Sequence, residues 1–272
     1  MAAELETAKL VSPAPRDIGA VNWLGFWTHY KKEVLRFTKI GFQTIAAPTV
    51  VTLLFLAVFS LALGRAAQVG GVPFDEFLAP GLIMMAVVQN SFANTSSSIM
   101  MAKIQGNIVD VLMPPLSGGE LALGYVLGGV SRGIAVAVAV GASLAVFVPM
   151  RIHDLGLIVF YTASASFMMA TLGIVIGLWA DKYDHVASIT NFIITPLSFL
   201  SGTFYSIERL PEPFFSLAAL NPFFYMIDGL RAGFIGRPDS SLLLGAAYLT
   251  VLNVALWAWC LHLLKIGYKI KA

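Results

Sequence analysis

The chain has 272 residues, of which 58% are hydrophobic and only 12% carry a charge, and its mean hydropathy is +0.81. Soluble globular domains carry about 25% charged residues, so this composition excludes that class and indicates a membrane protein. The net charge of +2 supplies no basic field for binding nucleic acid. Cys260 is the only cysteine, which excludes an intrachain disulfide and a cysteine-based metal cluster.

The N-terminal part of the chain contains two different segments. Residues 1–20 carry three acids and lack the apolar core of a cleavable signal peptide, so we interpret them as a cytosolic tail. In residues 21–39 apolar side chains recur at helical spacing beside lysines, which predicts an amphipathic helix lying in the membrane interface. It would serve either as an anchor only or as a coupling element. Its apolar stripe consists of Trp23, Phe26, Trp27, Tyr30, Val34 and Phe37.

The rest of the chain, residues 40–272, forms one predicted transmembrane domain. A helix rises 1.5 Å per residue, so about 20 apolar residues cross about 30 Å of hydrocarbon. Pro196 lies inside one apolar run, which membrane helices tolerate. The sequence therefore predicts an all-α integral membrane protein with six transmembrane helices, over residues 43–63, 79–102, 121–149, 155–180, 186–204 and 241–264.

Lysine and arginine in the flanks predict the orientation of these helices. With both termini inside the cell, all nine lysines lie on the cytosolic side. The basic residues of the outer loops are then all arginines, namely Arg65, Arg151, Arg209, Arg231 and Arg237. We therefore predict an N-in, C-in topology.

Two of the predicted spans carry uncharged polar stripes at helical spacing. Polar side chains are costly against lipid tails, so these stripes are expected to face another helix, a second protomer or a water-bearing path. Arg132 is the single charge inside a span, and it either has a buried role or snorkels to the interface. Glycine pairs four residues apart predict close packing of the third and fourth spans. The stripes are Asn90, Asn94 and Ser97, and Asn191, Thr195 and Ser198; the glycine pairs are Gly124 and Gly128, Gly129 and Gly133, and Gly173 and Gly177.

Two connecting segments also stand out. Residues 104–113 form a short amphipathic helix, with Asn107 as its cap and two prolines at its end. Its apolar face either docks another protein or lies on the membrane surface without a partner. Residues 208–238 are too apolar for a solvated loop and too interrupted by proline to cross, so we predict an external re-entrant hairpin.

Signals for chemistry are weak. The four histidines lie one per segment without the HExxH pattern, so we expect no metal site and no catalytic residue. A phosphate-binding P-loop requires a lysine directly after a glycine, and no lysine in this chain follows one. The chain is therefore not itself an ATPase, and a membrane-embedded hydrolase would lack a nucleophile with its base.

Two segments near the C-terminus carry a family resemblance. Residues 196–211 read PLSFLSGTFYSIERLP, and residues 220–231 read LNPFFYMIDGLR. This pair resembles the C-terminal signature of type-2 ABC transporter permeases, and the run from Met113 to Ser117 is similar to the first cytosolic coupling helix of that family. The likeness covers the chain from about residue 21 onwards. It is closest to bacterial export permeases of the drug and lipooligosaccharide branch.

The resemblance implies a non-enzymatic permease subunit of an ATP-driven exporter in the bacterial cytoplasmic (inner) membrane. It implies a homodimer with a separately encoded ATPase, which would hold ATP and Mg, with membrane lipid around it and no nucleic acid. The cargo would be amphiphilic, glycan or drug-like. Six-helix secondary carriers and channels share this hydropathy, so a carrier or channel without an ATPase is the alternative.

Three groups of residues receive roles from the resemblance. The polar stripes of the second and fifth spans would line the substrate path at the dimer interface. Coupling to the ATPase would fall to Ile104, Ile108, Val111, Leu112 and Pro115. The external hairpin would cap the exit with Pro211, Asn221, Pro222, Tyr225, Asp228 and Arg231.

Overall fold

A computed structural model describes residues 19–63, 68–207 and 210–269. The predicted cytosolic tail falls almost wholly outside them. The described residues are mostly helical, with one small antiparallel β-hairpin. The elements are α1 (Trp23–Lys39), the π-helical turn η1 (Phe42–Ala46), α2 (Ala47–Leu63), β1 (Gln68–Val69), β2 (Val72–Pro73), α3 (Phe74–Ile104), α4 (Ile108–Leu112), α5 (Gly118–Leu144), α6 (Leu155–Trp179), α7 (Tyr183–Ile189), the π-helical turn η2 (Thr190–Ile194), α8 (Thr195–Leu200), α9 (Phe214–Leu220), α10 (Pro222–Ile235) and α11 (Leu242–Ile266).

Five helices in the described part of the chain are long and apolar enough to cross a membrane. They are Phe42–Ala62, Phe74–Ile104, Gly118–Leu144, Leu155–Trp179 and Leu242–Ile266, and they coincide with five of the six predicted spans. The predicted span over residues 186–204 corresponds to α7, η2 and α8, where a π-helical turn interrupts the helix and the helix ends at Leu200. A sixth crossing therefore stays a prediction.

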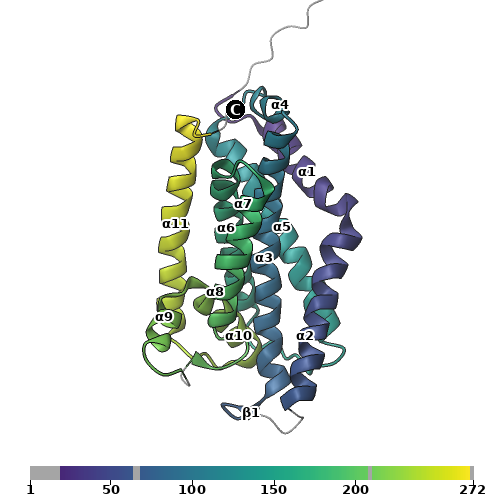
Figure 1. Cartoon of the computed structure of the whole chain (residues 1–272), viewed down its shortest axis with the longest axis vertical. Helices are drawn as coiled ribbons and strands as arrows, with labels where there is room; N and C mark the ends of the chain where they lie inside the picture. The colour runs from purple at the N-terminus through teal and green to yellow at the C-terminus, as the bar shows by residue number, and fades with distance from the viewer. Residues whose placement is uncertain (1–18, 64–67, 208–209, 270–272) are drawn as a thin grey trace, which may run out of the picture.

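The long helices run side by side along the long axis of the molecule (Figure 1). The start of α1, the short helix α4 and the end of α11 lie at one end, which we call the α4 end, and the β-hairpin, α9 and α10 lie at the other, the α10 end. Hydrogen bonds close the α4 end. The ammonium of Lys103 donates to the carbonyl oxygens of Leu178 and Ala180, and Lys269 donates to that of Trp179.

The helix α3 forms the centre of the bundle and is buried along most of its length against α5 and α6. Small residues permit this close approach. A Cβ added at Gly177 would lie 3.3 Å from the carbonyl oxygen of Ser96, and one at Gly129 would lie 2.6 Å from the Cβ of Ala170. The third and fourth predicted spans do touch, but several of their glycines face α3, which the sequence analysis did not anticipate.

The helix α1 packs on the bundle through polar and apolar side chains. His29, Glu33 and Phe37 are its buried residues. Gly124 and Gly128 of α5 leave room for His29 and Glu33. Trp23 and Trp27 of the aromatic stripe point away from the bundle, with 70% and 58% of their surface exposed. The side of α1 that carries these two tryptophans is therefore available to the membrane interface.

The short helix of the first loop differs in two details from its prediction. Ile104 is the last residue of α3 and not part of the short helix, because Gly106 adopts a positive φ of 70° and separates α3 from α4. The side chain of Asn107 does not cap α4; it donates instead to the side-chain oxygen of Gln105. The predicted helix over residues 104–113 thus shortens to Ile108–Leu112.

Candidate functional site

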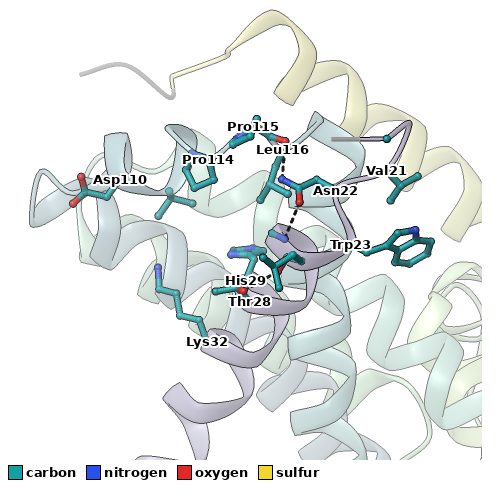
Figure 2. A pocket seen from close by; sticks show the side chains of 14 residues that line it. Val21, Asn22, Trp23, Thr28, His29, Lys32, Asp110, Pro114, Pro115 and Leu116 are labelled. Carbon is teal, nitrogen blue, oxygen red and sulfur yellow. Dashed lines mark hydrogen bonds between the residues drawn. The ribbon is translucent and has the colours of Figure 1, made fainter. Parts of the chain in front are cut away.

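A hydrogen-bonded junction joins the start of α1 to the loop between α4 and α5. The Asn22 side chain caps α1 by accepting from the Gly25 amide at 2.9 Å, and it donates to the carbonyl oxygen of Pro115 at 3.2 Å (Figure 2). One carboxylate oxygen of Glu120 accepts from the backbone amide of Asn22, and the other accepts from the backbone amide of Ser117, both at 2.6 Å. The capping box that starts α5 therefore also fixes the start of α1.

A groove of about 580 Å³ lies beside this junction, between α1 and the segment from Asp110 to Leu116 (Figure 2). Its wall is mainly apolar, with Trp23, Val111 and Leu116 among the lining side chains. Lys32 and Asp110 add one charge of each sign. The groove thus offers a neutral, largely apolar recess at the α4 end.

Apolar side chains around α4 are exposed next to the groove. Of the predicted coupling residues, Ile104 is 53% exposed and Leu112 is 39% exposed, whereas Val111 is buried, Ile108 is half-buried and Pro115 is exposed. The structure adds Val109 and Met113 to the exposed set. Exposed apolar side chains gathered on one short segment are typical of a surface that binds a protein or the membrane.

The sequence analysis missed Val109 and Met113 for a specific reason. It treated residues 104–113 as one helix, so both fell off the apolar stripe. In the structure Ile108 and Val111 of the stripe face inward, so Val109 and Met113 on the other side of α4 are exposed. Met113 directly precedes Pro114, so the helix was expected to end there. That position was the sequence signal that Met113 could be exposed.

His29 lies at the base of the groove with its ring edge-on to Tyr125. Burial, together with the charge of Lys32, lowers the pKa of His29 from its ordinary 6.5 to about 4. The folded protein therefore binds fewer protons than the unfolded chain between these values, and stability falls as the pH is lowered through them.

We expect a stability loss of about 2 kcal/mol from this histidine between pH 7.5 and pH 5. Thermal unfolding of the detergent-solubilised protein at the two pH values measures it. His29→Phe keeps the aromatic contact with Tyr125 but cannot titrate, so its pH-dependent loss is expected to be smaller by that amount. Equal losses in the two proteins would contradict the assignment.

The polar stripe of α3 faces charged side chains of the same protomer. Arg132 on α5 donates to the side-chain oxygen of Asn90 at 2.8 Å. Arg36 on α1 donates to the Asn94 side-chain oxygen at 3.1 Å and to the Ser97 hydroxyl at 3.2 Å. Arg132 is therefore directed into the bundle and does not snorkel to the membrane interface, the two alternatives that the sequence left open.

A buried acid completes this network. Glu33 is fully buried, pairs with Arg36 at 3.2 Å and accepts from the Ser98 hydroxyl at 2.8 Å. Sequence reasoning missed this site because Glu33 and Arg36 read as the solvated side of an amphipathic helix. Their spacing of three residues was a signal for an ion pair, but nothing in the sequence places α1 against α3.

The second polar stripe lies elsewhere. Asn191 is exposed, Thr195 is half-buried, and Ser198 is buried and donates to the carbonyl oxygen of Ile194. Among the residues that the structure describes, no hydrogen bond joins this stripe to that of α3. Both stripes remain predicted substrate-path residues, but only the one on η2 and α8 presents an exposed polar side chain, that of Asn191.

The predicted external hairpin corresponds to α9 and α10. Pro222 starts α10, and Asn221 caps it by accepting from the Phe223 amide while donating to the carbonyl oxygen of Leu197 at 2.7 Å. Pro211 accepts backbone hydrogen bonds at the start of α9. Tyr225 packs against Tyr248 of α11 with ring centroids 5.0 Å apart. These contacts fix the hairpin to its neighbours.

Asp228 and Arg231 of the hairpin are both buried and act as anchors. The Asp228 carboxylate accepts from the amides of Asp239 and Ser240 and from the Ser240 hydroxyl at 2.6 Å, which holds the start of α11. Arg231 donates to the carbonyl oxygen of Gly202 at 2.7 Å and stacks on Phe77. These residues thus position α10 within the protomer.

The five long apolar helices define a multi-pass helical membrane protein. A family model described as "ABC-2 type transporter" matches residues 25–235 of the chain. The chain belongs to this family, and it is accordingly a non-enzymatic transport permease of the inner membrane.

Relatives support this assignment over nearly the whole chain. The "Inner membrane transport permease YadH" of Escherichia coli strain K12 is 34% identical over 251 residues, which cover 92% of this chain and 98% of the relative. The "Nodulation protein J" of Rhizobium leguminosarum bv. viciae is 25% identical, with 86% of this chain and 90% of the relative covered. The corresponding protein of Neorhizobium galegae is 23% identical.

Proposed function

We propose that the chain is the membrane-spanning half of an ATP-driven exporter. Two copies would form the conduit. A separately encoded P-loop ATPase, which would hold ATP and Mg, would dock at the α4 end. The observation that carries the proposal is the exposed apolar surface around α4 beside the groove at the start of α1. A membrane protein without a P-loop of its own needs such a surface to receive work from an ATPase.

The junction at Asn22 supports a route for this work. Displacement of the loop that contains Pro115 would move Asn22 through their hydrogen bond. Because Glu120 bonds both Asn22 and Ser117, the starts of α1 and α5 would move with it. The network of Arg36 and Glu33 then links α1 to α3. Movement of the ATPase would tilt these helices as a rigid body between two packings of the dimer.

The substrate class follows from the surfaces left free in one protomer. The exposed side of η2 and α8 carries Asn191 beside Phe192, which is 79% exposed, and Phe199. Mixed polar and aromatic surfaces suit amphiphilic, glycan-bearing or drug-like molecules. We propose export of such a molecule from the cytoplasm.

Leu112→Asp is expected to abolish co-purification of a P-loop ATPase from native membranes. A carboxylate in the apolar contact would be desolvated without a partner, which costs several kcal/mol of binding free energy. Leu217→Asp on α9 is the matched control, since Leu217 is 52% exposed at the opposite end. If the wild-type protein purifies without an ATPase and an ion gradient drives its transport of solute, the carrier alternative replaces the proposal.

The proposed N-in topology with six crossings predicts which face each end of the bundle presents. Cys260 is fully buried, so single cysteines can be introduced at exposed sites without background labelling. In intact cells a membrane-impermeant maleimide is expected to label Ser216→Cys on α9 and to label Asp110→Cys on α4 only after permeabilisation. Labelling of Asp110→Cys in intact cells would reverse the orientation.

A further inference from the structure

An apolar groove of about 520 Å³ runs along the outside of the bundle between α5, α6 and α10. Its floor contains Ile83 and Gly141, and its rim is formed by exposed side chains such as Val138 and Val159. Along α5 and its C-terminal cap it extends from Ile134 to Ala145, which is about 16 Å at 1.5 Å per residue. This is about half of a 30 Å hydrocarbon core, the depth of one leaflet.

A second, polar pocket of about 560 Å³ lies at the α10 end of this groove. The two cavities share a wall made of Met150, Ile152 and Phe234. Backbone hydrogen bonds from the His153 and Asp154 amides to the carbonyl oxygen of Gly233, at 2.9 and 2.8 Å, hold this wall against α10. The apolar and polar cavities are therefore adjacent and fixed relative to each other.

The charges of the polar pocket favour an anion. Arg151 and Arg237 line it together with one acid, Glu76, and with the imidazole of His153. Arg237 donates to the carbonyl oxygen of Gly70 at 3.0 Å, and neither arginine has an ion pair among the residues that the structure describes. Guanidinium groups match phosphate oxygens in a two-pronged geometry.

We propose that these two cavities form a binding site for one anionic phospholipid of the leaflet at the α10 end. Its acyl chain lies in the groove along α5, and its phosphate lies between Arg151 and Arg237. The match in length to one leaflet indicates an acyl chain as the occupant of the groove. The excess of guanidinium over carboxylate selects an anionic headgroup over a neutral one. No residue that lines either cavity belongs to the exposed stripe on η2 and α8.

Bound lipid would add a further contact among helices that already pack on one another. It would contact α5, α6 and α10 at once, and through Arg237 it would reach the β-hairpin at Gly70. The lipid therefore stabilises the α10 end against separation of these helices. This consequence does not require an ATPase, so it stands or falls independently of the proposed export function.

Native mass spectrometry of the purified protein, titrated with phosphatidylglycerol or with phosphatidylcholine of the same acyl chains, tests the proposal. We expect about tenfold tighter binding of phosphatidylglycerol, because the choline cation of phosphatidylcholine offsets its phosphate charge beside the two arginines. Arg151→Ala with Arg237→Ala is expected to remove this preference by weakening phosphatidylglycerol binding more than phosphatidylcholine binding. Lys265→Ala, an exposed cation at the end of α11, is the charge control and should keep the preference.

The apolar groove is tested separately. Ala142 is exposed on the groove rim, so Ala142→Phe fills the groove without disturbing the core, and it is expected to lower binding of both lipids about tenfold. Val251→Phe on the exposed face of α11 is the size control. Equal binding of the two lipids by the wild-type protein, or a preference that survives loss of both arginines, would overturn the proposal. So would an acyl-chain photocrosslinker that reacts equally with α2, α11 and the groove.

Discussion

Arg36→Ala is expected to lower the free energy of unfolding by about 3–5 kcal/mol, the usual cost of removing one partner from a buried ion pair. Glu33 has no exposed surface, and Arg36 is its salt-bridge partner at 3.2 Å. Without the guanidinium the carboxylate keeps only the Ser98 hydroxyl, and Asn94 and Ser97 lose their donor as well. The midpoint of thermal unfolding of the detergent-solubilised protein measures this loss.

A double-mutant cycle separates the ion pair from the loss of side-chain packing. Glu33→Gln combined with Arg36→Gln removes both charges of the pair, so the double variant is expected to be less destabilised than the sum of the two single variants. Lys32→Ala, an exposed neighbour on the same helix, serves as the control and should change stability by less than about 0.5 kcal/mol. Additive losses in the cycle would show that the pair carries no coupling energy.

The sequence revealed the polar stripe of α3 but not its partners. Asn90, Asn94 and Ser97 lie at helical spacing in an apolar run, so a polar contact there was predictable. Their donors are Arg132 on α5 and Arg36 on α1, more than 40 residues distant along the chain. Pairing between helices depends on how they pack, and hydropathy does not contain that information.

The transmembrane helices were predictable because hydrophobic length is a property of the local sequence. Predicted and observed helix limits agree within about five residues for the five long spans. The segment over residues 186–204 was less predictable, since its interruption by η2 before Pro196 depends on how the freed carbonyls are satisfied.

The surfaces of the α4 end were partly predictable for a related reason. Periodicity identified a short amphipathic helix, but the packing of Ile108 and Val111 against the protein decides which of its side chains are exposed. The junction through Asn22 and Glu120 contains a capping box that can be read from Ser117 and Glu120 in the sequence. The contact of that box with α1 cannot be read there, because it joins residues 98 positions apart.

Gly173→Ala is expected to destabilise the bundle by about 3 kcal/mol, at the upper end of the usual cost of overpacking. A Cβ at this position would meet the Thr95 hydroxyl and would lie 2.6 Å from the carbonyl oxygen of Phe92. The carbonyl belongs to the backbone of α3 and cannot rotate away, so α3 and α6 must separate. Thermal unfolding measures the effect, and a change in the spacing of these central helices would also weaken transport.

Gly141→Ala is the matched control for this prediction. Gly141 also lies inside a long helix, but its added Cβ would lie 3.6 Å from the nearest atom, Cδ1 of Ile83, which is an ordinary contact. Alanine has the higher helix propensity, so this variant is expected to be neutral or more stable by up to about 1 kcal/mol. If both variants behave alike, the glycines of α6 do not set the distance to α3. If only Gly173→Ala is unstable, close backbone contact between α3 and α6 is what holds the centre of the bundle together.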